Sequence, residues 1–387
     1  MQATATVGPV LTSFDDYPIH QTSQPIAHTG SADLNHYDRY FFNGYTASGS
    51  LYFAAAMGLY PNRSVHDASF CVIRGAEQVS VYSSGRAPLD RQQANVVGPI
   101  EVRIIEPLRV AQLLIDAPDY GLRADLTFRA RTEALEEPHF LHRVGTKVVF
   151  DYTRLTQMGA WEGWVEVDGE RIDVSPGEVM GSRDRSWGVR PCGERVVGPA
   201  PTTPPQFFWL WAPLNFPSFA THFDVNDYSD GRRWHEVAAL IPASENHWRD
   251  GDAGPANFMR HADYEIAWQP GTRHAMGFDL TFHDWADEVA TIRLEPILHF
   301  QMIGIGYGHP QWNHGSWRGE SDVSGARLAL PVADPLNPSH IHVQTLSRAT
   351  FTHPCGQVEI GTGILETLAM GAHTPSGLTG IIDGYQP

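Results

Sequence analysis

The chain has 387 residues, of which 42% are hydrophobic and 11% aromatic, and this composition supports packed cores and excludes global disorder. One hydrophobic core usually stops growing below this length, so we expect two domains. The formal net charge is −17, and no lysine- or arginine-rich run occurs. Such a surface repels phosphate groups, so we expect no nucleic-acid partner and no binding to an anionic membrane.

The terminus and the cysteines predict a cytoplasmic protein. The N-terminal residues lack the positive and apolar regions of a secretory signal. No run of about 18 apolar residues occurs, so no helical membrane span is expected. Cys71, Cys192 and Cys355 are widely spaced and form no CxxC pair, which favours buried thiols in a reducing compartment.

Short alternating segments dominate the chain in its first half. Residues 1–35 are polar and aperiodic, and we expect an extended N-terminal arm there. Beyond them, alternation of apolar and polar residues predicts short strands, which include 69–73, 78–82, 100–105, 110–115 and 122–129. Helical periodicity is scarce, and its two short candidates are residues 50–57 and 284–287.

Turn signals complete the predicted architecture. The segment Trp161–Val174 predicts a hairpin, because its Asp168-Gly169 pair suits a tight turn with positive φ angles. Further turns are expected at 229–231 and 270–271.

A proline-rich stretch at 198–205 predicts a linker between two β domains, residues 36–197 and 206–387. Many short strands with close turns are typical of antiparallel barrels and sandwiches. The predicted fold class is therefore all-β, with two consecutive β-barrel or β-sandwich domains.

Several well-known catalytic and nucleotide-binding motifs are missing. The sequence has no GxxxxGK[ST] phosphate loop, no GxSxG elbow and no HExxH helix. The glycine-rich segment Gly304–Gly308 lacks the GxGxxG spacing and a surrounding βαβ pattern. We therefore expect no cofactor, and either catalysis in a pocket or simple binding.

The segment Gly181–Arg190 is the first candidate site because it concentrates charge. If residues 178–187 form a strand, alternation places Arg183, Arg185 and Trp187 on one face and Asp184 on the other. One interpretation makes Asp184 a buried catalytic acid, or uses the arginines and tryptophan to shape a ligand pocket. The other makes the segment a structural ion network at the domain junction.

The segment Gly306–Glu320 is the second candidate. His309 and His314 could act as general acid or base near neutral pH. Tyr307, Trp312 and Trp317 could supply an apolar wall. The alternative is a glycine-rich loop with aromatic side chains packed beneath it, and the functional interpretation is favoured because binding residues concentrate on loops.

A histidine pair raises the question of a metal. In a strand, His340 and His342 would share a face and could bind a metal ion together. A further ligand would have to come from His283, His299 or His353. Ordinary hydrogen-bonded histidines are favoured, and no metal is expected.

A second group of polar residues flanks the turn predicted at 229–231. His222 and Asp224 would share one strand face, with His235 and Glu236 across the hairpin. A histidine–carboxylate pair could form there, although solvent-facing positions are favoured for all four residues.

The aromatic run that follows the linker has two interpretations. The alternate residues Phe207, Trp209 and Trp211 could line a cavity, and simple packing is the favoured interpretation.

Several of these fragments carry a family resemblance. They are Tyr40–Gly44, Asp151–Gln157, Arg183–Arg190 and His309–Gly315, with Gly181–Gly188 closing the first domain. The chain resembles the two-domain lipocalin-like family of AttH-type proteins and carotenoid 1,2-hydratases (hydroxyneurosporene synthases), most closely a bacterial branch of it. The chain departs from the hydratases at Arg185-Ser186, where they carry other polar residues.

The resemblance implies two lipocalin-like β domains with an apolar cavity near their junction. Relatives hydrate isolated double bonds or, in some fungal members, guide pericyclic cyclisation. Such chemistry uses a proton donor in a dry pocket and no redox cofactor. By position, Asp184 matches the aspartate of the family signature.

The leading hypothesis is a cofactor-independent hydratase, dehydratase, isomerase or cyclase acting on a hydrophobic, isoprenoid-like or polyketide-like molecule. Asp184 or His314, with His309 as a further candidate, would move the proton. Substrate contacts would come from Tyr307, Arg183, Arg185, Trp187, Trp209, Trp211, Trp312 and Trp317.

Two alternatives remain open from the sequence. One is a non-catalytic carrier of a lipophilic molecule, and the other is a metal-dependent oxygenase that uses His340 and His342. The sequence does not decide between a monomer and a homodimer.

Overall fold

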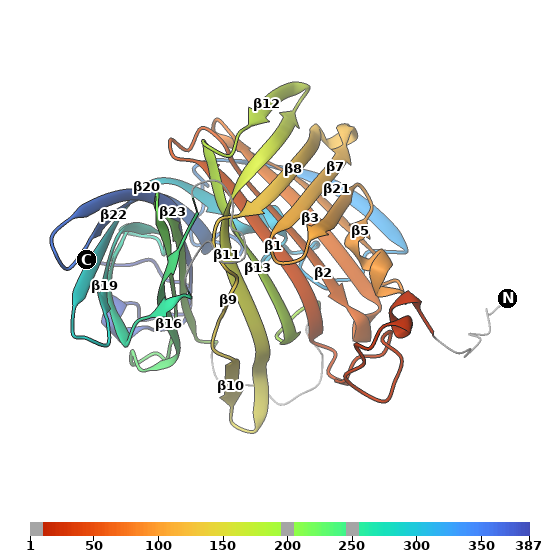
Figure 1. Ribbon diagram of the computed structural model, residues 1–387, viewed down its shortest axis with the longest axis horizontal. Helices are drawn as coiled ribbons and strands as arrows, with labels where there is room; N and C mark the ends of the chain where they lie inside the picture. Colours follow the sequence, from red (N-terminus) through yellow and green to blue (C-terminus); the bar gives the residue numbers. More distant parts are fainter. Residues whose placement is uncertain (1–10, 195–204, 245–254) are drawn as a thin grey trace.

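A computed structural model describes residues 11–194, 205–244 and 255–387. The protein is all-β, as predicted, and consists of two large antiparallel sheets that lie next to each other (Figure 1). This arrangement agrees with the expected pair of lipocalin-like β domains. Among the described residues, no helix is long and apolar enough to cross a lipid bilayer.

The first sheet holds fourteen strands of the described chain, in the order β21-β4-β3-β2-β1-β13-β11-β8-β7-β6-β5, with β9, β10 and β12 attached to β11. Its strands are β1 (His36–Thr46), β2 (Tyr52–Tyr60), β3 (Val65–Arg74), β4 (Glu77–Arg86), β5 (Val96–Val97), β6 (Ile100–Glu106), β7 (Val110–Ala117), β8 (Leu122–Ala130), β9 (Leu135–Glu136), β10 (Phe140–Val144), β11 (Lys147–Val167), β12 (Glu170–Val174), β13 (Val179–Val189) and β21 (Ser321–Ala329).

The second sheet holds nine strands of the described chain, in the order β17-β16-β15-β14-β23-β22-β20-β19-β18. Its strands are β14 (Phe207–Asn215), β15 (Phe219–Asp227), β16 (Arg233–Pro242), β17 (Asn257–Phe258), β18 (His261–Trp268), β19 (Ala275–His283), β20 (Val289–Gln301), β22 (His342–Thr352) and β23 (Val358–Met370). Short 3-10 helices connect the strands: η1 (Ser13–Asp16), η2 (Pro61–Arg63), η3 (Arg91–Asn95), η4 (Pro118–Tyr120), η5 (Met302–Ile305) and η6 (Thr374–Ser376).

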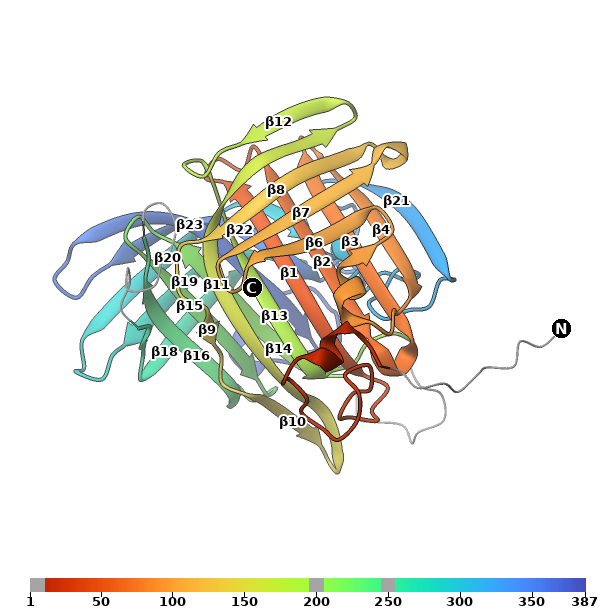
Figure 2. The same cartoon turned by 45° about the vertical axis from the view of Figure 1, so that its right-hand side comes forward.

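Strand β21 links the two halves of the chain. It comes late in the sequence but pairs with β4 at the edge of the first sheet, where Figure 2 shows it beside the early strands. The chain therefore leaves the second sheet after η5, crosses to the first sheet and returns for β22. Apart from Pro205, the linker expected at 198–205 lies outside the described residues.

The predicted strands and turns are confirmed. Each of the five predicted alternating segments lies within one of β3, β4, β6, β7 and β8. The segment Trp161–Val174 forms the β11–β12 hairpin, and Asp168 and Gly169 have φ angles of 52° and 81°. Turns at 229–231 and 270–271 join β15 to β16 and β18 to β19.

The short helical candidate at 50–57 is not a helix. Residues 52–57 lie in β2, whose nine residues are all buried. A strand that is covered on both faces reads as a continuous apolar run and shows no alternation. Its alanines and methionine suit a helix locally, so only packing on both sides decides for a strand.

The short helical candidate at 284–287 is not a helix either, because these residues form the turn between β19 and β20. The side chain of Asp284 accepts hydrogen bonds from the backbone N–H groups of Ala286 (2.7 Å) and Glu288 (2.8 Å). Asp287 has a positive φ of 62°. Such a side-chain-to-backbone turn competes with helix formation.

The N-terminal arm and the cysteines were also the subject of predictions. The described part of the N-terminal arm is fixed to the first sheet, since Ser13 bonds to Asp90 (2.9 Å) and Arg91 bonds to the carbonyl of Ala27 (3.0 Å). Cys71 and Cys192 are buried free thiols as predicted, but Cys355 is exposed in the turn between β22 and β23.

Strand β1 separates two hydrophobic cores by alternation. Phe42 packs on Trp161 at a ring-centroid distance of 5.9 Å, in the core of the first sheet. Its neighbour Phe41 faces the other way and meets Trp211 of β14 edge-on at 6.0 Å. One face of the first sheet thus covers its own core, while the opposite face packs against the second sheet.

The turn at Gly169 provides a stability test. Its φ of 81° lies in the left-handed region, where an L side chain costs about 1–2 kcal/mol. We expect Gly169→Ala to lower the free energy of unfolding by about 1 kcal/mol, as measured by urea denaturation. No heavy atom lies within 4 Å of the added Cβ, so the loss would come from the backbone alone.

Gly177→Ala is the matched control. It also has no heavy atom within 4 Å of an added Cβ, but its φ lies outside the left-handed region. We expect its unfolding midpoint to equal or exceed that of the wild type. Equal stability of the two variants would contradict the predicted backbone strain.

Candidate active site between the two sheets

Asp184 lies on the face of the first sheet that meets the second sheet. In the β1–β13 pairing it stands directly opposite Phe41, and in the β11–β13 pairing it stands opposite Thr156. Directly paired residues share a face, so Asp184 joins the layer that contains Phe41 and Trp211. Strand alternation therefore turns this carboxylate toward the junction of the two sheets.

The carboxyl group of Asp184 is poised to exchange a proton. It forms no hydrogen bond or ion pair with any described residue, and it is half-buried. Burial raises the pKa of Asp184 to about 6, and the positive charges of Arg154, Arg190 and Arg39 oppose that rise. Near neutral pH the group can be populated in both protonation states, which suits a general acid or base.

A polar network on one side of Asp184 contains the predicted His314. The guanidinium of Arg39 lies 2.7 Å from Nε2 of His314, and Nδ1 of His314 lies 3.9 Å from a carboxylate oxygen of Asp67. Burial, reinforced by Arg39, holds the pKa of His314 well below its ordinary value, so the ring is neutral and Nε2 accepts from Arg39. Burial also raises the pKa of Asp67 to about 6.

Tyr307, another predicted site residue, lies against this network. Its ring meets His314 at 4.5 Å and His342 at 4.8 Å, both edge-on. The guanidinium of Arg39 lies 4.6 Å from the centre of the same ring. The segment that begins at Gly306 thus meets the segment Gly181–Arg190 at the junction, because Arg39 stands opposite Ser186.

A second network lies on the other side of Asp184 and is centred on Arg154. Its guanidinium binds Glu137 through Nε (2.9 Å) and Nη2 (2.5 Å), and it also forms an ion pair with Asp224. Thr156 donates to Glu137 (2.5 Å), and His222 lies 3.2 Å from the same carboxylate. Because all these groups are buried, each ion depends on its partners.

Aromatic rings surround the guanidinium of Arg154. Its central carbon lies 4.8 Å from the ring centre of Phe140, 5.5 Å from that of Trp209 and 5.7 Å from that of Trp211. Trp209 also donates its indole N–H to Asp224 (3.0 Å). Trp209 and Trp211 therefore belong to the junction layer, where they were predicted either to line a cavity or to pack.

Among the described residues, one group has its ligand atoms close enough together to hold a metal ion, and it lies beside Arg154. Ligand atoms of Glu137, Asp224 and His235 lie within 4.8 Å of one another. The two carboxylates, however, already share the guanidinium of Arg154. A divalent cation would have to displace that guanidinium from both carboxylates, so this group does not fit a resident metal.

The metal hypothesis for His340 and His342 is not supported by their positions. Strand β22 begins at His342, and His340 lies in the preceding turn, where Nδ1 is 2.7 Å from the carbonyl oxygen of Asp334. His342 instead bonds to the buried carboxylate of Glu366 at 2.5 Å. The shared strand face that the hypothesis required therefore does not form.

The three further ligands considered for that metal have other partners. His299 bonds to the carbonyl of Ala275 (3.0 Å), and His353 bonds to Glu359 (2.9 Å). His283 bonds to Asp263 (3.0 Å) on strand β18.

Arg183, Arg185 and Trp187 do not line the junction with Asp184. As alternation predicted, they lie on the opposite face of β13. Arg183 bonds to Gln157 (2.8 Å), Arg185 pairs with Asp38, and Trp187 is 41% exposed. A strand turns adjacent side chains to opposite sides, so these three side chains point away from a substrate held at Asp184.

The remaining residues of the second predicted segment pack on β4. Trp312 stacks on Tyr82 at 5.9 Å, and His309 contacts the same ring at 5.0 Å. Nδ1 of His309 accepts from the backbone N–H of Trp312 (2.9 Å), while Trp317 is 43% exposed. His309 and Trp312 fit the alternative of aromatics packed under a glycine-rich loop, whereas Trp317 lies at the surface.

A small cavity adjoins this loop. It has a volume of about 10 Å³, and its lining includes Asp67, Tyr82, Trp312 and His314. That space suits about one water molecule.

The predicted hairpin cluster divides between the two faces of the second sheet. His235 turns inward, where its ring stacks on Phe140 at 3.7 Å, and burial lowers its pKa to about 3. Glu236 turns outward and pairs with Arg233 (2.5 Å). His222, Asp224 and His235 are therefore buried at the junction, and the favoured solvent-facing interpretation is wrong for these three.

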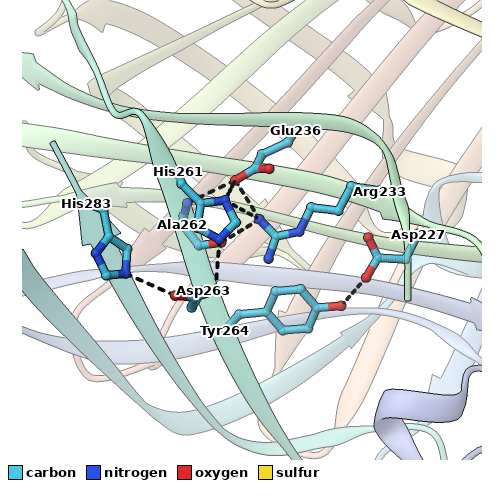
Figure 3. Close-up of polar contacts among 8 residues, drawn as sticks. All are labelled: Asp227, Arg233, Glu236, His261, Ala262, Asp263, Tyr264 and His283. Carbon is cyan, nitrogen blue, oxygen red and sulfur yellow. Dashed lines mark hydrogen bonds and ion pairs between the residues drawn. The ribbon is translucent and has the colours of Figure 1, made fainter. Parts of the chain in front are cut away.

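The outward group forms a separate polar cluster, which Figure 3 shows on strands β16, β18 and β19. Asp263 accepts from His261 (2.9 Å) and His283 (3.0 Å), while Glu236 accepts from the backbone N–H of Ala262 (2.9 Å). Asp263 is largely exposed, and its hydrogen bonds are made within the cluster. This arrangement stabilises the sheet edge and offers no group comparable to Asp184.

Most of the charged residues of the site cannot be singled out from the sequence pattern. Arg39, Arg154, Arg190, Glu137 and Asp67 were not proposed. One signal could have found two of them: the pattern Tyr-x-Arg occurs at Tyr37–Arg39 and at Tyr152–Arg154. Both patterns lie on strands that flank β13, and both arginines stand opposite Ser186.

Comparison with known proteins places this architecture among solved structures. No curated protein sequence matches the chain. An AttH-like protein from Nitrosomonas europaea is 13% identical and matches with a TM-score of 0.50, over 86% of this chain and 92% of that one. Kievitone hydratase from Nectria haematococca is 12% identical, with a TM-score of 0.49 over 86% and 88% of the two chains.

The likeness to the AttH-like protein concerns the fold alone, because the identity is low. A family model gives the closer assignment, since it matches residues 11–379 and so spans both sheets and the junction between them. The chain belongs to the family of unknown function DUF8625.

Proposed function

We propose that the protein is a cofactor-independent acid/base enzyme of the hydratase/dehydratase or isomerase/cyclase type, acting on a hydrophobic small molecule at the junction of the two sheets. The observation that carries the proposal is Asp184: a carboxyl group without a partner among the described residues, held between two arginine-centred networks. The reaction class is also the one that the sequence resemblance leads us to expect.

The chemistry follows from the position of the carboxyl group. In hydration of a double bond, Asp184 would give its proton to one carbon while water adds its hydroxyl group to the other. The second proton of that water would return to the Asp184 carboxylate, so the enzyme ends unchanged. Dehydration is the reverse, and isomerisation returns the proton to a different carbon.

The surrounding residues support this role. Burial strengthens electrostatic interactions and raises the pKa of Asp184 to about 6, so the protonated form is available near neutral pH. The indole rings of Trp209 and Trp211 make the wall of this layer aromatic, and an aromatic face stabilises a nearby cation by about 0.5–2 kcal/mol. His314 is neutral and bound to Arg39, so it is better suited to position that arginine than to supply a proton.

A trapped-ligand experiment tests the proposal and needs no candidate substrate. Wild type and Asp184→Asn are purified from separate cultures of the same host. Bound small molecules are then extracted, and their masses are measured by mass spectrometry. We expect the variant to retain the unconverted molecule. The wild type should carry a product that differs by one water, or an isomer with a different retention time. The same unchanged molecule in both preparations would instead identify a carrier.

A further inference from the structure

Two guanidinium groups at the junction lack a carboxylate partner. Arg39 is 1% exposed, and only its Nη2 is engaged, with His314 at 2.7 Å. Its Nε and Nη1 are buried without a hydrogen-bond partner among the described residues. A buried donor without an acceptor costs about 1–3 kcal/mol, and more when it is charged. Such donors are a recurring feature of sites that bind anions.

Arg190 lies close to Arg39. Its guanidinium is 4.6 Å from the ring centre of Tyr37 and 5.9 Å from that of Tyr307, while Arg39 is 4.6 Å from Tyr307. The guanidinium of Arg190 forms no hydrogen bond or ion pair with a described residue. The two arginines thus lie near the same tyrosine ring, and both have N–H donors that bond to no described residue.

No described carboxylate forms an ion pair with Arg39 or Arg190, so their positive charges are not neutralised by a direct partner. The positive charges of both Arg39 and Arg190 lower the pKa values of Asp184 and Asp67, so both carboxyl groups are near neighbours. Neither carboxylate comes within ion-pair distance of either guanidinium, in contrast to Arg154, which pairs with Glu137 and Asp224. An incoming anion would therefore meet two unpaired cations.

We propose that Arg39 and Arg190 bind a substrate oxygen that is anionic or becomes anionic during the reaction. This oxygen would belong to a carboxylate, or to the carbonyl group of an α,β-unsaturated ketone or acid. The inference rests on the proposed function and names its substrate class. Guanidinium groups present paired N–H donors that match such oxygens, and both guanidinium groups lie near the flat ring of Tyr307. The apolar remainder of the substrate would lie toward Trp209 and Trp211.

This binding mode gives the arginines a part in the reaction. When water adds to the β-carbon of an unsaturated carbonyl compound, the electrons of the double bond move to the carbonyl oxygen. Arg39 and Arg190 would stabilise the resulting enolate. The α-carbon then takes the proton of Asp184, and the proton lost by the added water restores that carboxyl group. The sum is the addition of one water molecule.

Equilibrium binding of a simple probe tests the inference. The probes are cinnamate and its uncharged isostere cinnamamide, measured by calorimetry with the full-length protein. We expect cinnamate to bind about tenfold more tightly than cinnamamide or better. Arg39→Gln and Arg190→Gln should each lower the cinnamate affinity by about tenfold or more and remove the preference over the amide.

Arg185→Gln is the matched control, because Arg185 lies on the opposite face of β13 and pairs with Asp38. We expect it to bind cinnamate like the wild type. Should Arg39→Gln fail to fold, Arg190→Gln decides the question, since Arg190 is only half-buried. Equal affinities for cinnamate and its amide, or unchanged affinity in Arg190→Gln, would overturn the anion site.

The failure of this inference can be distinguished from the failure of the proposed function. Binding of cinnamate does not need Asp184, so Asp184→Asn should bind the probe at least as tightly as the wild type. If Asp184→Asn keeps full turnover while Arg190→Gln loses the probe, the acid/base assignment fails and the anion site stands. If Asp184→Asn loses turnover while Arg190→Gln binds the probe like the wild type, the acid/base assignment stands and the anion site fails.

Discussion

Asp184→Asn is expected to lower turnover by about 10²–10⁴-fold, the range typical of a lost general acid or base. Asparagine keeps the size and polarity of the side chain but cannot exchange a proton. The carboxyl group of Asp184 makes no hydrogen bond to a described residue, so its replacement leaves no described group unpartnered. We therefore expect unchanged thermal stability together with the loss of activity, once the trapped ligand provides a substrate.

The pH profile gives an independent check on the same residue. Burial raises the pKa of Asp184 to about 6. Hydration starts from the protonated acid, so kcat/KM should fall as the pH rises above about 6, and dehydration should show the reverse. The step near pH 6 should be absent from the residual activity of Asp184→Asn.

Asp67 provides the control for this profile, because burial also raises its pKa to about 6. Its carboxylate accepts from the backbone N–H of Gly315 (2.6 Å) and faces His314, beyond Arg39. Other charged groups at the junction include Glu137, whose pKa is lowered by Arg154 and His222 against the effect of burial, and Arg154 and Arg190, whose pKa values are raised, so these three do not change ionisation near this pH. Asp67→Asn should retain the step near pH 6, and its disappearance in that variant would assign the step to Asp67 instead.

Arg154→Leu is expected to lower the free energy of unfolding by about 3–5 kcal/mol, measured by urea denaturation near pH 7. The guanidinium is the shared partner of two buried carboxylates, Glu137 and Asp224. Leucine would leave both buried without their cation. Arg86→Leu is the control, because its ion pair with Glu320 is exposed and should contribute little to stability.

The loss in Arg154→Leu should also depend on pH. In the wild type, burial acts to raise the pKa of Glu137, but Arg154 and His222 outweigh it and hold that pKa below its ordinary value. The stabilisation is therefore present above the ordinary glutamate pKa and is lost as the pH falls through the lowered value. Without Arg154, burial would dominate and the ionised carboxylate would become unfavourable.

We accordingly expect the difference in unfolding free energy between wild type and Arg154→Leu to grow from pH 4 to pH 8. Replacing all three ions together, with Glu137→Met, Arg154→Leu and Asp224→Leu, should recover a large part of the loss, because no buried charge then remains unpaired. A difference that is independent of pH would contradict the assigned ion network.

Local physics determined much of this protein from sequence alone. Alternation within β3, β4, β6, β7 and β8 predicted strands, because half-buried strands expose every second residue. The positive φ required by Asp168-Gly169 fixed one hairpin. The same alternation correctly separated Asp184 from Arg183 and Arg185, since the backbone alone sets which side chains share a face.

Only the tertiary structure decided which face of β13 meets the second sheet, and therefore which arginines surround Asp184. Arg39 comes from β1 and Arg154 from β11, far from Asp184 in sequence, and the partners His314 and Asp224 come from the other half of the chain. No local pattern encodes such contacts. Strand β2 escaped prediction for a related reason: burial on both faces, imposed by the second sheet, removes the alternation by which a strand is recognised.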